Sequence, residues 1–197
     1  MENMNILTDD MLVVRYSEGD NKAFDELLAR YQSKLFNYIY FIVRSQELAE
    51  DLFQETFVKA ITTIQQGRYT AAGKFGAWLT RIAHNLIIDG YRQERNENTI
   101  SNDETEMDLL NDADLCDDNV EVQMVNEQTL RDVRRLVDAL PDNQREVVYM
   151  RFYQDLSFKE IAEITGVSIN TALGRMRYAL LNMRRIAEEK HIVLEMY

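Results

Sequence analysis

An uninterrupted acidic segment in the middle of the chain places the strongest limit on how the chain can fold. Residues 97–128 contain eleven carboxylates and neither Lys nor Arg. The segment is rich in Asn and Asp and has no sustained helical stripe of apolar residues before about Val120. A segment of this composition cannot bury enough apolar surface to offset the loss of chain entropy. The sequence therefore predicts a flexible acidic linker between two flanking folded parts.

Both flanks have the composition of helical bundles. The net charge of the chain is −12, of which residues 1–96 contribute only −2 and residues 129–197 contribute +1. The chain has only seven Gly and one Pro to interrupt helices, and 46% hydrophobic residues, which is enough for packed cores. We predict an all-α protein with two small helical domains at 1–96 and 122–197, joined by an acidic flexible linker at 97–121.

Several classes of protein do not fit the sequence. No apolar run approaches the roughly 20 residues needed to span a bilayer, and the N-terminus lacks the pattern of a signal peptide. The single cysteine, Cys116, excludes an internal disulfide, and with two histidines it cannot complete a structural zinc site. Catalytic and phosphate-cradling motifs are absent. We expect a cytoplasmic binding protein, not an enzyme, that needs no metal or other cofactor.

Residues 46–64 predict a helix with two contrasting faces. Leu52, Thr56 and Ala60 belong to its apolar stripe. The opposite face gathers acidic and amide side chains at helical spacing: Glu47, Glu50, Asp51, Gln54 and Glu55. Such a face is commonly just solvated, but it would also suit the basic surface of a partner.

Residues 74–95 predict a third helix, with Trp78 on the buried side and a ridge of cations on the other. The ridge consists of Arg81, Asn85, Arg92 and Arg95, with Arg68, Tyr69 and Lys74 in the preceding loop. Cations and amides suit phosphates and base edges, and aromatic rings can receive unstacked bases. His84 is expected at the surface or as a hydrogen-bonded helix residue, and Asp89 can pair with Arg92 or Arg81.

Residues 157–185 have the pattern of a helix-turn-helix. Ser157 and Glu160 match a capping box, Gly166 supplies a left-handed residue after the first helix, and Ser168 caps the second. The second helix is predicted to point Asn170, Thr171, Gly174, Arg175 and Arg177 outward, and Ile169, Ala172, Met176, Leu180 and Met183 inward. No acid lies between Ser168 and Arg185, as expected where carboxylates would face DNA. The alternative is a merely basic surface helix in a bundle.

In this order, the motifs resemble those of the extracytoplasmic-function (ECF) sigma factors of bacterial RNA polymerase, which belong to the sigma-70 family. The segment AEDLFQETFVKA is similar to region 2.2 of that family, and FGAWLTRIAHNLIIDGYRQER is similar to regions 2.3 and 2.4. The segment LPDNQREVVYMRFYQDLSFKEIAEITGVSINTALGRMRYAL is similar to region 4. The resemblance implies a sigma factor that directs core polymerase to promoters and assists their melting.

The resemblance also implies roles for individual residues. Binding to the β′ coiled coil of core polymerase falls on Asp51, Gln54 and Glu55. In the first domain, Asn85 would hold a base flipped from the −10 element, and the strand would be supported by Arg68, Tyr69, Arg81 and Arg92. In the second domain, −35 DNA would be bound by Ser168, Asn170, Thr171, Arg175 and Arg177. The implied partners are the β′ and β subunits, promoter DNA and an anti-sigma factor.

Two other functions are weighed against a sigma factor. A polymerase-independent helix-turn-helix regulator explains residues 157–185 equally well, but not the acidic face at 47–55 or the ridge at 81–95. A polymerase-binding anti-activator without DNA contact does not explain the carboxylate-free helix. Because each domain has little net charge and DNA affinity depends on phosphate neutralisation, we expect DNA binding mainly as holoenzyme. The linker is expected either to act as a spacer or to follow a basic channel of the polymerase.

Overall fold

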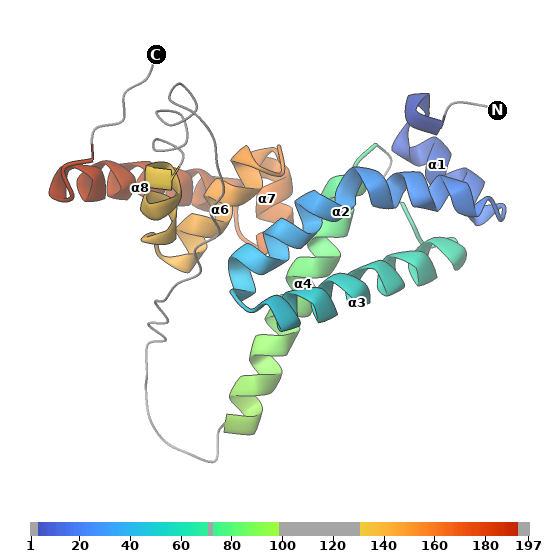
Figure 1. Ribbon diagram of the computed structural model, residues 1–197, viewed down its shortest axis with the longest axis horizontal. Coiled ribbons are helices and arrows are strands. Elements are labelled where there is room, and N and C mark those ends of the chain that lie inside the picture. Colours follow the sequence, from blue (N-terminus) through green and yellow to red (C-terminus); the bar gives the residue numbers. More distant parts are fainter. Residues whose placement is uncertain (1–3, 71–72, 99–130, 193–197) are drawn as a thin grey trace, which may run out of the picture.

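The computed structural model describes residues 4–70, 73–98 and 131–192, and within these ranges the chain forms helices and turns without a strand. The prediction of an all-α protein is confirmed. The N-terminal group contains a 3-10 helix and four α-helices (Figure 1): η1 Met4–Ile6, α1 Asp9–Ser17, α2 Asn21–Val43, α3 Gln46–Gln65 and α4 Phe75–Asn98. The C-terminal group contains helical residues 131–138, then α6 Asp142–Phe152, α7 Phe158–Thr165 and α8 Ile169–Glu189. Apart from the end of α4, the predicted linker lies outside the described residues.

Local hydrogen bonds fix where most of these helices begin. The side chain of Asp20 accepts from the Lys22 backbone N–H at the start of α2. Ser157 and Glu160 form a reciprocal capping box at the start of α7, as predicted. Gly166 ends α7 in the left-handed conformation with φ 67°, which glycine adopts without steric cost. These caps satisfy backbone groups that a helix end would otherwise leave unpaired.

The core of the N-terminal group lies where α1, α2, α3 and α4 meet. Leu12, Leu27 and Ile39 are fully buried there, and Phe75 and Leu79 of α4 are 1% exposed. Apolar burial on this scale, at roughly 1.5–3 kcal/mol for each large side chain, is what holds the bundle together.

Gly76 lets α4 approach α2 closely. A Cβ atom at this position would lie 2.8 Å from Cε1 of Tyr31, a contact that requires the ring or the helix to move. The glycine therefore contributes to the position of the first turn of α4, directly after the loop that carries Arg68 and Tyr69.

The core of the C-terminal group is formed by α6, α7 and α8, and it corrects one prediction. Ala172 and Met176 are buried as expected, but Ile169 and Leu180 are 46% and 52% exposed. The covered face of α8 is centred on Ala172 and Ala179, and both α6 and α7 pack against this helix. The flank with Ile169 and Leu180 therefore stays uncovered.

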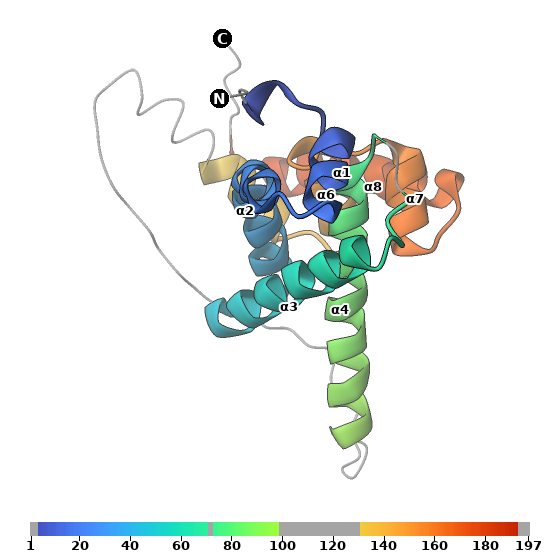
Figure 2. The same ribbon diagram turned by 90° about the vertical axis from the view of Figure 1, so that its right-hand side faces the viewer.

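The two groups pack against each other through α2 and α4 on one side and α6 and α7 on the other (Figures 1 and 2). The ring of Tyr149 in α6 lies 4.6 Å from the ring of Phe41 in α2, measured between centroids. Polar contacts also join the two groups: Arg44 pairs with Asp138 at 2.9 Å, and the Gln154 amide donates to the backbone oxygen of Lys34 at 2.7 Å. The C-terminal half of α4 projects away from this contact.

Candidate polymerase- and DNA-binding surfaces

The predicted acidic face of α3 points to solvent. It comprises Glu47, Glu50, Asp51, Gln54 and Glu55, all of which are exposed. The helix buries its opposite side through Leu52 and the fully buried Thr56, whose hydroxyl donates to the Leu52 backbone oxygen at 2.6 Å. Among the described residues, no basic side chain pairs with Asp51 or Glu55. The face therefore carries charge that a basic partner can neutralise.

The cationic ridge predicted for α4, called the α4 ridge below, consists of Arg81, Asn85, Arg92 and Arg95. Asn85 and Arg92 are exposed, and Arg92 pairs with Asp89 at 3.5 Å, one of the two pairs that the helical spacing allowed. Arg81 instead reaches across to the other group and pairs with Glu163 of α7 at 3.4 Å. Arg95 belongs to α4, but its side chain lies outside the described residues.

The carboxylates of α7 engage two of the cations near the start of α4. Besides the Arg81–Glu163 pair, Lys74 Nζ lies 3.2 Å from Glu160 Oε1. Partial burial tends to raise the pKa of Glu160, but hydrogen bonds from Ser157 and the contact with Lys74 lower it below its ordinary value. The capping residue of α7 thus also contributes to the contact between the two groups.

The loop between α3 and α4 carries Arg68 and Tyr69, which differ in their surroundings. Arg68 is exposed and contacts the side chain of Gln66. Tyr69 is half-buried, with its ring 4.8 Å from the ring of Trp78, edge to face. Its hydroxyl donates to Asp10 of α1 at 3.3 Å, and burial together with that carboxylate raises the pKa of Tyr69. The tyrosine predicted to support DNA is therefore part of a packed aromatic cluster.

For His84 of α4, the sequence left two possibilities: a surface position or a hydrogen-bonded position within the helix. It is 8% exposed, and its Nδ1 lies 2.8 Å from Oε1 of Glu146 in α6. The Tyr38 hydroxyl donates to the same oxygen at 3.0 Å. His84 is thus a hydrogen-bonded helix residue, one of the two options. Glu146 was missed because it lies 62 positions away along the chain, where no local spacing links the two.

The second helix of the helix-turn-helix, α8, presents a cationic surface. Ser168, Asn170, Thr171 and Arg177 are exposed, and Arg175 is half-buried. The Ser168 hydroxyl accepts from the Thr171 backbone N–H at 3.0 Å, which confirms it as the helix cap. In the part of the chain that the structure covers, Arg175, Arg177 and Arg184 have no carboxylate partner.

Sequence reasoning missed an apolar strip beside these arginines. Leu173, Tyr178 and Leu181 are between 44% and 62% exposed. Leu173 and Leu181 help to line a shallow groove of about 350 Å³, which Arg177 and Arg184 also border. The signal was present in the sequence as apolar residues on both sides of the helical stripe, but only the packing showed which side is covered.

These surfaces define an all-helical, two-part protein with one acidic helix face, a cationic ridge on α4 and a helix-turn-helix. Residues 27–97 match the family Sigma-70 region 2, and residues 130–180 match Sigma-70, region 4. No helix within the described ranges is long and apolar enough to cross a membrane.

Relatives of known identity extend the match over most of the chain. The chain is 32% identical over 192 residues to the ECF RNA polymerase sigma-E factor of Haemophilus influenzae, which covers 93% of this chain and 95% of the relative. It is 36% identical over 156 residues to the ECF RNA polymerase sigma factor BldN of Streptomyces coelicolor, covering 79% of this chain and 56% of that protein. The chain therefore belongs to the ECF sigma factors of RNA polymerase, as its motifs predicted.

A solved structure of CnrH in complex with the cytosolic domain of CnrY shares the fold, with a TM-score of 0.62 at 22% identity over 92% of this chain and 97% of that one. Because both sigma regions are present in order, the protein is an RNA polymerase sigma factor, and a polymerase-independent regulator is not favoured.

Proposed function

We propose that this sigma factor divides its work among three surfaces and acts by binding, without bond chemistry of its own. Asp51, Gln54 and Glu55 on α3 bind the basic surface of the polymerase β′ subunit. The observation that carries this assignment is the separation of charge: the exposed carboxylates of α3 and the exposed cations of α4 and α8 lie on different helices. An acidic face and a cationic face on one small protein suit one protein partner and one nucleic acid.

The −35 element is bound by α8 in the major groove. Arg175 and Arg177 lie in its N-terminal half, and arginine can bond both acceptors of a guanine edge or clamp the phosphate backbone. Ser168, Asn170 and Thr171 stand at the helix start, where backbone N–H groups and the helix dipole favour phosphate.

The −10 element is held as single strand along α4. Asn85 presents an amide that can both donate to and accept from a flipped base. Arg68, Tyr69, Arg81 and Arg92 support the strand around it. Unstacking costs a few kcal/mol per base, so capture of the extruded base must offset that cost for melting to proceed.

Binding both elements requires the two groups to separate. In the structure, Arg81 of the α4 ridge contacts Glu163, only a few residues before the start of α8. Sites named −10 and −35 lie about 25 base pairs apart, or roughly 85 Å of duplex at 3.4 Å per pair. A fully extended chain covers 3.3–3.6 Å per residue, so the linker predicted at 97–121 can reach roughly 80–90 Å. We therefore assign the packed arrangement to the free protein and an open one to the holoenzyme.

If the two groups separate in this way, residues 1–96 and 122–197 act as two domains. The eleven acids of residues 97–128 give the intervening segment a charge that suits a basic channel of the polymerase. Two solved structures with a similar fold are complexes: CnrH is bound to the cytosolic domain of CnrY, and the sigma factor RpoE of Bartonella quintana is bound to the anti-sigma factor NepR. By analogy, an anti-sigma factor holds this protein in the cytoplasm until its signal arrives.

Run-off transcription with core polymerase on a promoter library tests the proposal. Charge reversal at Asp51 and Glu55 should reduce capture of core polymerase at least tenfold, whereas reversal of Asp25, an exposed acid of α2, should not. Asn85→Ala should abolish promoter opening without loss of polymerase binding. Arg175→Ala should lower transcription from promoters with a −35 element, with Arg185→Ala as the control because Arg185 pairs with Glu189 at the far end of α8. Normal behaviour of the Asp51/Glu55 reversal, of Asn85→Ala and of Arg175→Ala would refute the assignment.

A further inference from the structure

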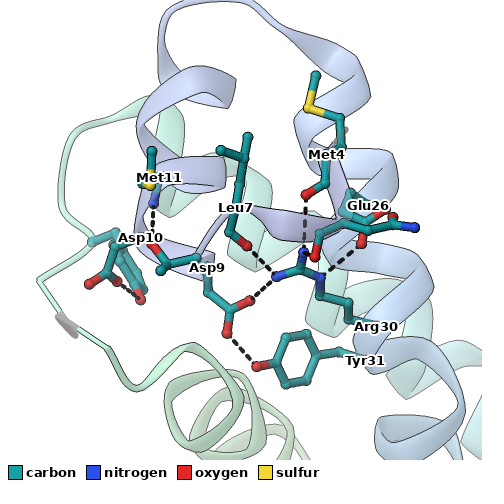
Figure 3. Close-up of polar contacts among 11 residues, drawn as sticks. Met4, Leu7, Asp9, Asp10, Met11, Glu26, Arg30 and Tyr31 are labelled. Carbon is teal, nitrogen blue, oxygen red and sulfur yellow. Dashed lines mark hydrogen bonds and ion pairs between the residues drawn. The ribbon is translucent and has the colours of Figure 1, made fainter. Parts of the chain in front are cut away.

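Two neighbouring residues of α2, Arg30 and Tyr31, hold the start of α1 in place. Arg30 Nη1 donates to the Leu7 backbone oxygen and to Asp9 Oδ1, both at 2.9 Å, and its Nη2 donates to the Met4 backbone oxygen at 3.2 Å (Figure 3). Tyr31, one position further along α2, donates from its hydroxyl to the other oxygen of Asp9. Because charge-assisted hydrogen bonds are the stronger kind, the first turn of α1 has a fixed position on α2.

Asp10, the next residue, connects this fixed turn to the loop between α3 and α4. Its Oδ2 accepts from the Gly73 backbone N–H at 2.7 Å, and its Oδ1 accepts from the Tyr69 hydroxyl at 3.3 Å. Both oxygens of one carboxylate are therefore used, and they contact the loop on either side of residues 71–72. Gly67 and Gly73 both have positive φ, and glycine loses more conformational freedom on folding than other residues, so the contacts of Asp10 offset part of the cost of ordering this loop.

We propose that Asp10 is a positioning residue for promoter melting: it fixes the loop so that Arg68 and the packed ring of Tyr69 meet the −10 single strand in one conformation. This inference rests on the function proposed above. Asp10 touches neither DNA nor polymerase in this assignment. It acts through its contacts with Tyr69 and Gly73, which hold the loop in place directly after Arg68 and again just before the start of α4.

The sign of the electrostatic effect separates positioning from simple charge. A carboxylate near a DNA-binding loop repels phosphate, so its removal would strengthen DNA binding if its charge were all that mattered. Loss of the anchor has the opposite effect, because the loop must then be ordered at the moment of binding and that ordering opposes affinity.

The test uses holoenzyme reconstituted with Asp10→Ala, Asp10→Asn or Tyr69→Phe. The control is Asp25→Ala, which likewise removes one carboxylate from the N-terminal group, but an exposed one on α2. We measure capture of core polymerase, affinity for a single-stranded −10 oligonucleotide, and fluorescence of a base analogue at the melted position. Asp10→Ala should weaken oligonucleotide binding about five- to tenfold with unchanged capture of polymerase. Asp10→Asn should lose less, because its amide oxygen still accepts from Gly73. Asp25→Ala should bind equally or more tightly.

The double variant Asp10→Ala/Tyr69→Phe gives a second, independent reading. If the two residues act through one contact, its loss of affinity should be no larger than that of Asp10→Ala alone. Affinity equal to or above that of the unaltered protein in Asp10→Ala would overturn the inference, as would full additivity in the double variant. If Asp10→Ala fails to fold, Asp10→Asn and Tyr69→Phe decide the question. A normal Asp10→Ala beside a defective Asn85→Ala refutes only this inference, whereas normal Asn85→Ala and Arg68→Ala refute the −10 assignment itself.

Discussion

The two cationic surfaces of this sigma factor differ in how far the folded chain neutralises them. On the surface at the start of α4, two carboxylates of α7 pair with cations: Glu160 with Lys74, and Glu163 with Arg81. On the α8 surface, Arg177 is exposed and Arg175 is half-buried, and neither has a carboxylate partner among the described residues. The packed arrangement therefore occupies part of the surface proposed to bind the −10 element and leaves the surface proposed to bind the −35 element available. Opening of the molecule should change −10 binding more than −35 binding.

The largest effect should come from Glu146→Ala, which removes the acceptor shared by Tyr38 and His84. A hydrogen bond to a charged group contributes about 1.5–3 kcal/mol, and the variant loses two of them across the contact between the two groups. The Tyr38 hydroxyl and His84 Nδ1, 3.3 Å apart, then have only each other as partners among the described residues. We expect the packed arrangement to loosen, which small-angle scattering or fluorescence transfer between labels on α3 and α8 would detect. Glu188→Ala, an exposed acid near the end of α8, is the control. An unchanged scattering profile for Glu146→Ala would mean that the Glu146 contacts are not needed to hold the two groups together.

The next largest effect is expected at the α8 surface proposed to bind the −35 element. Arg177→Ala should weaken −35 binding by holoenzyme by about 1–3 kcal/mol where the arginine reads a base, and should then relax the preference at that base pair. If Arg177 instead contacts phosphate, the loss should be similar for every −35 sequence and the salt dependence should fall by about one charge. A titration over salt concentration with two −35 sequences distinguishes these results. No loss with either sequence would remove Arg177 from the interface.

A smaller effect is expected from Glu163→Gln, which breaks the exposed pair with Arg81. Surface pairs contribute about 0–1 kcal/mol, so stability should barely change. Binding of the −10 single strand should strengthen up to a few fold, because Arg81 no longer has to leave a partner. Asp138→Gln removes the Arg44 pair at the same interface without affecting the α4 ridge, and it serves as the control. A weaker −10 affinity in Glu163→Gln would contradict the idea that this pair competes with DNA.

The smallest effect is a pH dependence of the contact between α4 and α7. Because the pKa of Glu160 is lowered in the folded protein, its contribution is fully present above the ordinary value of 4.5 and is lost as the pH falls through the lowered pKa. Fluorescence transfer between the two groups should therefore decrease in acid more in the unaltered protein than in Glu160→Gln. The same acid dependence in both proteins would exclude Glu160 as its source.

Helix starts and helix faces were predictable because they depend on neighbours in sequence. Asp20, Ser157 and Gly166 each form their capping contact within a few residues, so the pattern of letters contains the whole interaction. The acidic face of α3 followed from helical spacing alone, because its buried stripe is continuous. The inward direction of Ile169 and Leu180 was predicted wrongly, because a helical stripe can be wider than the surface that neighbouring helices cover.

The sequence by itself determined the helices, their caps, the charge of each face and the family, since all of these are encoded over short distances along the chain. Only the tertiary structure decided that Glu146 meets His84, that Glu163 engages Arg81 and that Asp10 reaches Tyr69 and Gly73. These pairs join residues 59 to 82 positions apart, where the packing of whole helices brings the partners together. No local pattern specifies such a meeting, because each side chain would be equally compatible with solvent.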